Sequence, residues 1–282
     1  AALGITQQEL GTDIQETGGR NVEEVNEAER NLDAAITSAA SLTVSTTSNL
    51  AANVTTSGIQ TYGGAVVLEV DTTLTTTDSN ITFNSTVRSD SADTPRDLTI
   101  NLDANSNGTT ADLIINGIVG GNSLPLDVIS ITGDLDLNSS IGNSPGATSL
   151  TVSGDANLGA DVETTGTQTY SGNATISNNI TLTTTNSNVS FGGTTNAGTA
   201  GNTLTIAAGT GDVTFTGAVG ETAMGNTTIT TGALSAAAIK VQGTLSITNS
   251  DTSSITGIIS DGASSAILTK SGSGTLTLST NN

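Results

Sequence analysis

The sequence predicts an all-β fold, a right-handed parallel β-solenoid with a short helical segment at its N-terminus. The first observation is an internal repeat: the segment Ser41 to Phe83 recurs without a gap from Ser149 to Phe191, with 23 of 43 positions identical. The second is that short runs of aliphatic residues alternate with Thr, Ser and Asn, the pattern of half-buried strands. The third is an aromatic content of only 2%.

The rarest residues follow the repeat best. The chain has two tyrosines and three phenylalanines. Tyr62 and Tyr170 occupy equivalent places in the two copies, as do Phe83 and Phe191. Self-similarity of this kind indicates a stacked architecture in which each unit contacts its neighbours, so we expect the two tyrosines to pack identically.

Residues 1–40 differ from the rest of the chain and carry 8 of its 26 acidic residues. Asn21 and Glu24 have the spacing of a capping box, and a stripe at helical period follows from Val22 through Leu32 to Ile36. We expect a helix from about Val22 to Ala39 and a shorter one from Thr6 toward Ile14. The segment is interpreted as a cap on the first solenoid turn; a coiled-coil or docking helix is the alternative.

From Ser41 onward the period is two, which divides the chain into a first solenoid repeat (41–148), a second (149–242) and a partial third (243–282). Glycine pairs such as Gly63-Gly64 separate the runs and indicate sharp corners. Eight residues are predicted to form the buried column: Leu42, Val44, Leu74, Phe83, Leu150, Val152, Leu182 and Phe191.

An array of β-sandwiches is the competing architecture for many short strands. Sandwich domains normally bury large aromatic residues between their sheets, and this chain has no Trp. A solenoid needs only a narrow column of aliphatic side chains, so the composition favours it. With turns of roughly 20 to 25 residues, we expect about ten to twelve turns and a rod roughly 50 Å long.

The charge excludes one class of partner. A net charge of −20, from 26 acidic and six basic residues, repels nucleic acid, which binds to clustered Lys and Arg. An anionic membrane surface is disfavoured for the same reason, and no apolar run approaches the length of a membrane span.

The sequence predicts no catalytic, cofactor-binding or metal-binding residue. Without His or Cys, a Ser-His-Asp triad, a catalytic Cys-His pair and a His or Cys zinc site are all absent. Polysaccharide hydrolases and lyases with solenoid folds need paired carboxylates, for which the candidates are Asp134 with Asp136, and Asp155 with Asp161 and Glu163. Asp134 and Asp136 flank Leu135 and face the same side, which we interpret as a solvated strand rather than a cation site.

Two threonine runs, 73–77 and 181–185, are candidates for the flat threonine ladders of ice-binding solenoids. Their regularity in the sequence is low, and outward Thr is the ordinary choice on a strand surface. The sequence therefore favours an ordinary strand surface at both.

The last segment, Thr256 to Asn282, has a distinctive core made up of Leu268, Lys270, Gly272, Gly274, Leu276, Leu278 and Asn281. In these residues it resembles the autotransporter-associated β-strand repeat, and the rest of the chain is similar in style to large haemagglutinin-like and adhesin exoproteins. The resemblance implies a β-solenoid passenger displayed on, or released from, the surface of a Gram-negative bacterium.

Together these features predict a non-enzymatic extracellular structural protein: a surface filament subunit, stalk or adhesin. A carbohydrate-active or carbohydrate-binding solenoid is the alternative. The expected partners are the chain itself, associating head to tail or laterally, or a host or neighbouring cell surface. The segment Gly274 to Asn282 is strand-forming and leaves an unpaired edge, to which the N-terminal segment of another copy is the expected complement. The alternative is a longer passenger that continues into further turns.

Overall fold

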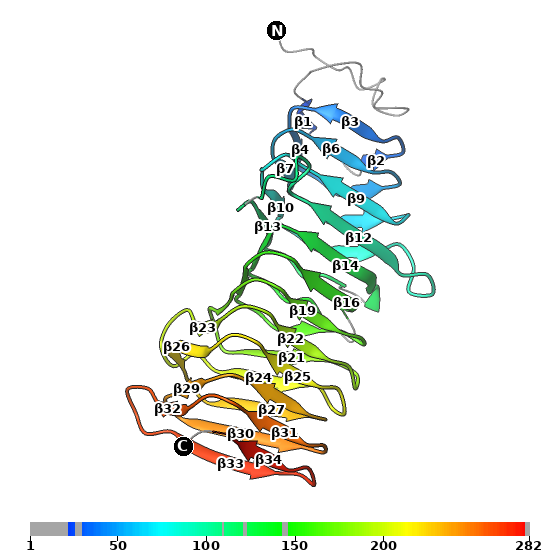
Figure 1. Cartoon of the computed structure of the whole chain (residues 1–282). Helices are drawn as coiled ribbons and strands as arrows, with labels where there is room; N and C mark the ends of the chain where they lie inside the picture. The colour runs from blue at the N-terminus through cyan, green and yellow to red at the C-terminus, as the bar shows by residue number, and fades with distance from the viewer. Residues whose placement is uncertain (1–21, 26–29, 109, 121–122, 143–145, 280–282) are drawn as a thin grey trace.

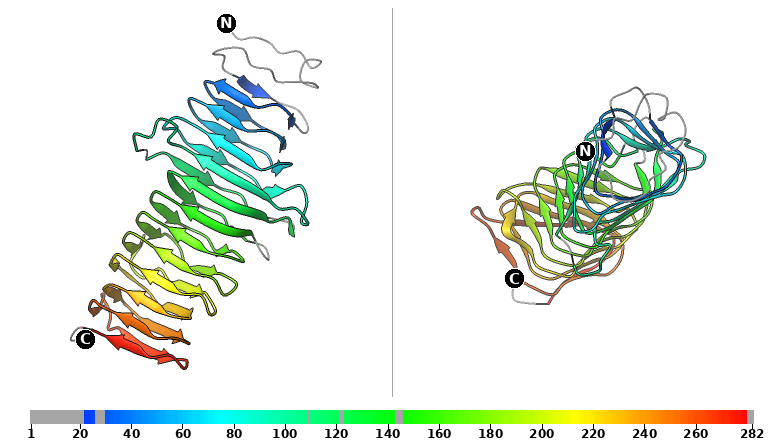
Figure 2. Two further views of the ribbon diagram at one scale, coloured as in Figure 1. Left: turned by 45° about the vertical axis from the view of Figure 1, so that its right-hand side comes forward. Right: turned by 90° about the horizontal axis from the view of Figure 1, so that it is seen from above.

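The computed structural model describes residues 22–25, 30–108, 110–120, 123–142 and 146–279. Over these residues the chain winds into a right-handed parallel β-solenoid of about 12 turns (Figure 1), which confirms the predicted fold class. Successive turns stack along one axis, and the ribbon colours run in order from one end of the rod to the other (Figure 2). The strands form four parallel sheets on three faces of the rod, called here faces A, B and C.

Face A is a continuous sheet of twelve strands. In chain order they are Val22–Val25 (β1), Leu42–Val44 (β4), Gln60–Tyr62 (β7), Ile81–Phe83 (β10), Asp112–Ile115 (β13), Asp134–Leu137 (β15), Ala156–Leu158 (β17), Ala174–Ile176 (β20), Thr195–Ala197 (β23), Val219–Met224 (β26), Ile239–Val241 (β29) and Ile259–Asp261 (β32).

Face B consists of a four-stranded and a six-stranded sheet, joined through single bridges that run from Val87 to Val119, Ile141 and Val162. The four-stranded sheet contains Arg30–Leu32 (β2), Ser48–Leu50 (β5), Val66–Leu68 (β8) and Val87–Ser89 (β11). The six-stranded sheet contains Val162–Glu163 (β18), Ile180–Thr183 (β21), Leu204–Ala207 (β24), Thr227–Thr231 (β27), Thr244–Asn249 (β30) and Ile267–Ser271 (β33).

Face C is again a continuous twelve-stranded sheet. Its strands are Ile36–Ala39 (β3), Val54–Thr56 (β6), Thr72–Thr75 (β9), Arg96–Asn101 (β12), Leu126–Thr132 (β14), Ala147–Val152 (β16), Gln168–Tyr170 (β19), Val189–Phe191 (β22), Val213–Phe215 (β25), Leu234–Ala236 (β28), Ser253–Ile255 (β31) and Leu276–Leu278 (β34).

The core is a single apolar column along the axis, because alternate residues of each short strand point inward. All eight residues predicted for the buried column are buried. Inside the column the ring of Tyr62 stacks on Phe83 with centroids 5.3 Å apart. The ring of Tyr170 stacks on Phe191 at 5.1 Å, and Phe191 stacks in turn on Phe215 at 4.9 Å.

A buried polar network accompanies each tyrosine. The Tyr62 hydroxyl donates to Oε1 of Gln60 (3.0 Å), and Gln60 Nε2 donates to the carbonyl of Thr75 (2.9 Å) and to the Thr56 hydroxyl (3.3 Å). The second copy repeats each contact with its own residues: Tyr170 donates to Gln168 (3.3 Å), and Gln168 Nε2 donates to the carbonyl of Thr183 (2.9 Å) and to the Thr164 hydroxyl (3.2 Å). The predicted equivalence of the two tyrosines is therefore confirmed.

The two copies nevertheless lie on different faces. Strand β4 of face A corresponds in sequence to β16 of face C, β5 of face B to β17 of face A, and β6 of face C to β18 of face B. Between β4 and β16 the chain passes fourteen strand positions, the twelve strands β5 to β16 and the two bridge residues Val119 and Ile141. Fourteen positions at three per turn are four and two-thirds turns, so the second copy is rotated by one face. The sheets of faces A and C run without a break through the predicted repeat boundaries, which therefore mark repeats of the sequence and not breaks in the fold.

The predicted helix from Val22 to Ala39 is wrong over the described residues, which form strands β1, β2 and β3 of the first turn. Leu32 and Ile36 have helical spacing, but a corner separates them: Leu32 ends β2 and Ile36 begins β3. Both side chains are buried, with Leu32 in register with Leu50 and Ile36 with Val54 of the next turn. Burial against that turn outweighs helix propensity, which is a weak preference. The shorter helix predicted from Thr6 lies outside the described residues.

Gly133 alone separates β14 on face C from β15 on face A. Its φ of 126° is open only to glycine, and a Cβ there would come within 2.8 Å of Leu102 Cδ1.

Candidate functional site

Asp134 and Asp136 project from the outer side of β15, as the alternation predicted. Oδ1 of Asp134 accepts the backbone N–H of Asp155 in the next turn at 2.8 Å. Oδ1 of Asp136 accepts from Asn157 Nδ2 at 2.9 Å, and its Oδ2 accepts from Asn138 Nδ2 at 3.1 Å. Both carboxylates therefore link adjacent turns of the rod.

The other three candidate acids are divided between two faces. Asp155 precedes β17 on face A, and its Oδ1 accepts the backbone N–H of Asn173 at 2.7 Å. Asp161 precedes β18 on face B, where its Oδ1 accepts the N–H of Thr181 at 2.7 Å, and Glu163 is the last residue of β18. The structure thus brings Asp155 to Asp134 and leaves Asp161 and Glu163 on another face.

These contacts belong to ladders of Asp and Asn that follow the corners of the rod. In each step a side-chain oxygen of one turn accepts the backbone N–H of the next, as from Asn53 to Thr73, from Asp97 to Val128 and from Asn188 to Asp212. A second ladder, on face A, joins side chains only: Asn116 donates to Asn84 (2.9 Å) and Asn138 to Asn116 (3.1 Å). The four candidate aspartates, Asp134, Asp136, Asp155 and Asp161, make such contacts between turns.

The carboxylates of face A perturb one another. Asp112 is in register with Asp134. Partial burial, followed by the negative charges of Asp134 and Asp136, raises the pKa of Asp112 above its ordinary value. Partial burial also raises the pKa of Asp134, and the charge of Asp155 adds to this while the Asp155 N–H opposes it. The described residues contain no group of three or more His, Cys, Asp and Glu side chains placed to hold a metal ion.

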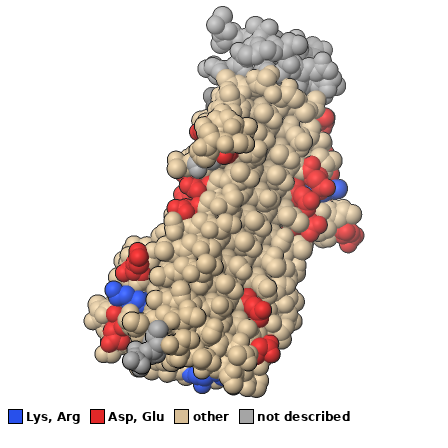
Figure 3. Space-filling view, in the orientation of Figure 1, with Lys and Arg blue, Asp and Glu red and all other residues tan. Residues whose placement is uncertain are grey.

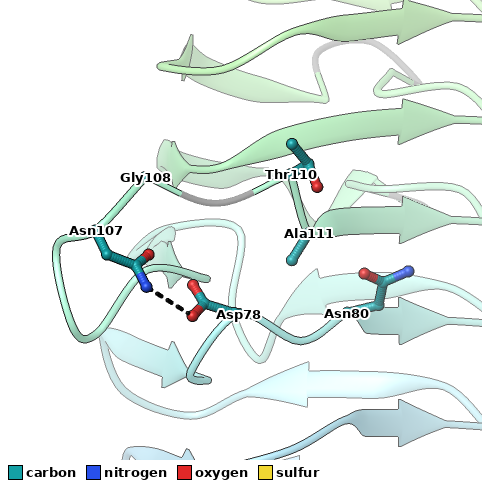
Figure 4. Close-up of a pocket in the computed structure, with 6 residues that line it drawn as sticks. All are labelled: Asp78, Asn80, Asn107, Gly108, Thr110 and Ala111. Atoms are coloured by element: carbon teal, nitrogen blue, oxygen red, sulfur yellow. Dashed lines mark hydrogen bonds between the residues drawn. The ribbon is translucent and has the colours of Figure 1, made fainter.

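The sequence reasoning did not single out the polar loop after β12. Asp78 and Asn107 line an open depression of about 380 Å³ together with Asn80, Gly108, Thr110 and Ala111 (Figure 4). Asp78 Oδ2 accepts from Nδ2 of Asn105 (2.7 Å) and of Asn107 (3.2 Å). The carboxylate of Asp103 accepts the N–H groups of Asn107 (3.0 Å) and Gly108 (3.1 Å).

A sequence signal for this loop exists. Asp103, Asn105, Asn107 and Gly108 have the D-x-N-x-N-G spacing that opens an EF-hand calcium loop. The twelfth position of such a loop, normally a bidentate Glu, is here Ile114. The carboxylate of Asp103 closes the loop on itself, and that of Asp78 ties the loop to the preceding turn.

The two threonine runs lie on different faces, because Thr73 belongs to β9 on face C and Thr181 to β21 on face B. Each starts a column of outward hydroxyl groups. On face B the column from Thr181 covers five turns, through Thr205, Thr228, Ser246 and Thr269. On face C the column that starts at Thr73 covers ten turns. In the view of Figure 3, charged side chains lie toward the margins of the rod, and a broad uncharged surface runs between them.

Comparison of the chain with protein-family models, with curated proteins and with solved structures finds no match. The described part of the chain includes no helix with the length and apolarity needed to cross a membrane.

Proposed function

We propose that this chain is a non-enzymatic structural rod outside the cell, serving as a surface filament subunit, stalk or adhesin. The observation that carries the proposal is the use of the candidate acids: Asp134, Asp136, Asp155 and Asp161 all connect neighbouring turns. Carboxylates that are used to connect turns have a structural role, which favours an elongated scaffold over a catalytic site. The segment that resembles the autotransporter-associated repeat supports an extracellular location on a Gram-negative bacterium.

A screen for turnover tests the non-enzymatic role. The full chain is incubated with acidic and neutral polysaccharides, with and without calcium, and no product is expected. If product does form, Asp134→Asn decides its origin, because this variant keeps the Oδ1 acceptor for Asp155 but removes the carboxylate. Turnover that disappears in Asp134→Asn would replace the structural role by a carbohydrate-active one.

We propose further that the rod associates with itself end to end. At its C-terminal end β32, β33 and β34 are the last strands of their sheets, so one side of each has no strand partner within the described residues. Apolar side chains are exposed beside these strands: Leu268, in register with buried Leu245, is 39% exposed, and Leu278 is 36% exposed. A strand edge flanked by exposed apolar side chains favours the addition of another β-layer.

Light scattering coupled to size-exclusion chromatography tests this association. We expect the full chain to form multimers whose size grows with concentration. Leu268→Lys should disrupt them, because the lysine places a charge among the apolar side chains exposed at this end. The matched control is Thr269→Lys, which adds the same charge one residue away on the outer face. A chain that stays monomeric at every concentration, or equal behaviour of the two variants, would rule out this mode of association.

A further inference from the structure

Face C carries an unbroken column of hydroxyl side chains. The middle outward position is Ser or Thr in every one of the ten turns from β9 to β34, and the strand register places these residues directly above one another. In order they are Thr73, Thr99, Ser130, Thr151, Thr169, Ser190, Thr214, Ser235, Ser254 and Thr277.

This column is not a simple result of composition. The corresponding column of face A runs from Thr43 through Thr61 and Thr82 to Ile114 and Asp136, so it mixes hydroxyl, apolar and charged side chains. Further along face A come Asn157, Thr175 and Asn196 in the same column. The two faces share the same turns and the same chain, and only face C keeps one chemistry over ten turns.

A second column lies beside the first, two residues further along each strand. It begins with Thr75, Asn101 and Thr132, which are in register with one another. It continues, each backbone N–H bonded to the turn before, with Ser153, Ser171, Gly192, Thr216, Ala237, Thr256 and Ser279. Face C therefore presents a two-column array with a repeat of ~4.8 Å along the rod and roughly 6.7 Å across it, over roughly 43 Å.

The hydrogen-bonding capacity of the first column is unused. Within the described part of the chain, none of its ten hydroxyl groups hydrogen-bonds to another protein group, and all ten side chains reach solvent. The Asn ladder of face A is the opposite case, since Asn84, Asn116 and Asn138 satisfy one another. A hydroxyl group offers one donor and two acceptor sites, so the column directs a periodic set of both toward whatever covers face C.

The chemistry of the array selects its partner. It contains no charged residue, which argues against an ionic mineral or a polyelectrolyte. All five aromatic residues of the chain are buried, so no ring is exposed on which a sugar could stack. The first column has no apolar residue whose burial would drive the pairing of two copies. A rigid, neutral lattice of water molecules has the matching chemistry, because each of its surface sites offers donors and acceptors at regular intervals.

We infer that face C is an ice-binding surface, on which the first column of hydroxyl groups, flanked by the partly hydroxylated second column, binds water molecules in the periodic arrangement of an ice crystal face. Six of the ten residues are Thr, whose γ-methyl group restricts the rotamer of the hydroxyl beside it. The stacked turns of the solenoid hold the array in place before contact, so little conformational freedom of the backbone and side chains is lost on binding. This inference goes beyond the proposed structural role and does not depend on end-to-end association.

The test uses the fluorescently labelled full chain and a slowly grown ice hemisphere, together with thermal hysteresis and ice recrystallisation assays. The disruptive variant is Thr151→Tyr with Thr169→Tyr, which raises two bulky side chains from adjacent turns at the centre of face C. The matched control is Thr175→Tyr, an exposed threonine in the equivalent middle position of β20 on face A. Circular dichroism melting confirms that each variant is folded.

We expect the wild-type chain and Thr175→Tyr to coat the ice and to slow recrystallisation, and the face C double variant to lose both activities. A wild-type chain that stays in the liquid like an unrelated labelled protein would overturn the inference, as would equal loss in Thr175→Tyr. Pull-downs on cellulose and chitin and a measurement of oligomeric state run in parallel. A second way to overturn the inference is a wild-type chain that fails to adsorb to ice but binds a polysaccharide or dimerises. If the face C double variant abolishes that binding, the face is assigned to that partner.

Discussion

Tyr62 and Tyr170 are 108 residues apart and have the same contacts, yet Tyr62 lies on face A and Tyr170 on face C. The sequence repeat is therefore a screw operation of four and two-thirds turns rather than a translation. It is possible because the three faces of a solenoid have nearly the same geometry, so a strand with its corner residues fits any of them. The copies then provide two independent measurements of each interaction.

The buried glutamines allow the first comparison. Gln60→Ala removes the acceptor of the Tyr62 hydroxyl and the donor to the carbonyl of Thr75. Since buried polar groups left without partners cost about 1–3 kcal/mol, we expect a loss of that size in the free energy of unfolding. Gln168→Ala should cost the same, as measured by urea denaturation at equilibrium. A clear inequality between the two variants would contradict the equivalence of the networks.

The apolar column allows the second comparison. Leu74 and Leu182 are equivalent in sequence and fully buried on faces C and B respectively. Truncation of either to Ala should lower the free energy of unfolding by about 2–5 kcal/mol. The neighbouring outward residues Thr73 and Thr181 supply the controls, whose change to Ala should leave stability nearly unaltered. Melting temperatures unaffected by both Leu variants would show that these side chains do not carry the core.

The fold was largely predictable because burial alternates with period two and the repeat is strict at rare residues such as Tyr62. The helix predicted over Val22–Ala39 failed because the distance from Leu32 to Ile36 fits a helical turn and a solenoid corner equally well. The sequence offered the run 73–77 as a candidate threonine ladder but favoured an ordinary strand surface, because the rest of the array that begins at Thr73 is not visible in it. Corners and loops of unequal length separate Thr99 from Ser130 and Ser130 from Thr151 in the sequence, and only the strand register brings them into one column.

The corner ladders predict a difference between two substitutions of the same residue. Asp161→Asn keeps the oxygen that accepts the N–H of Thr181, whereas Asp161→Ala leaves that N–H without its partner. We expect Asp161→Ala to destabilise the rod by about 1 kcal/mol, a typical net value for one hydrogen bond, and Asp161→Asn to cost less. Thermal unfolding measures both. Equal destabilisation by Asn and Ala would mean that the charge of Asp161, not its acceptor, is what matters.

The last prediction concerns pH and the carboxylates of face A. Partial burial and the charges of Asp134 and Asp136 raise the pKa of Asp112, so the folded state holds this proton more tightly than the unfolded chain, where the pKa of Asp is about 3.9. Between the two pKa values the folded state binds more protons. Its free energy of unfolding therefore falls as pH rises through that window, and the stabilisation returns on acidification.

Asp112→Asn removes the partly buried carboxylate next to Asp134 and Asp136. We therefore expect this variant to be more stable than the wild-type chain at neutral pH and to lose less stability as pH rises from about 3.9 toward neutrality. Asp93→Asn, a change of the same net charge at an exposed loop residue, is the control for the chain's overall negative charge. Urea unfolding across that range measures all three proteins. If Asp112→Asn and Asp93→Asn shift stability equally at every pH, the general charge of the rod accounts for the effect. A flattening confined to Asp112→Asn would show that the local environment of Asp112, its partial burial together with the charges of Asp134 and Asp136, causes the effect.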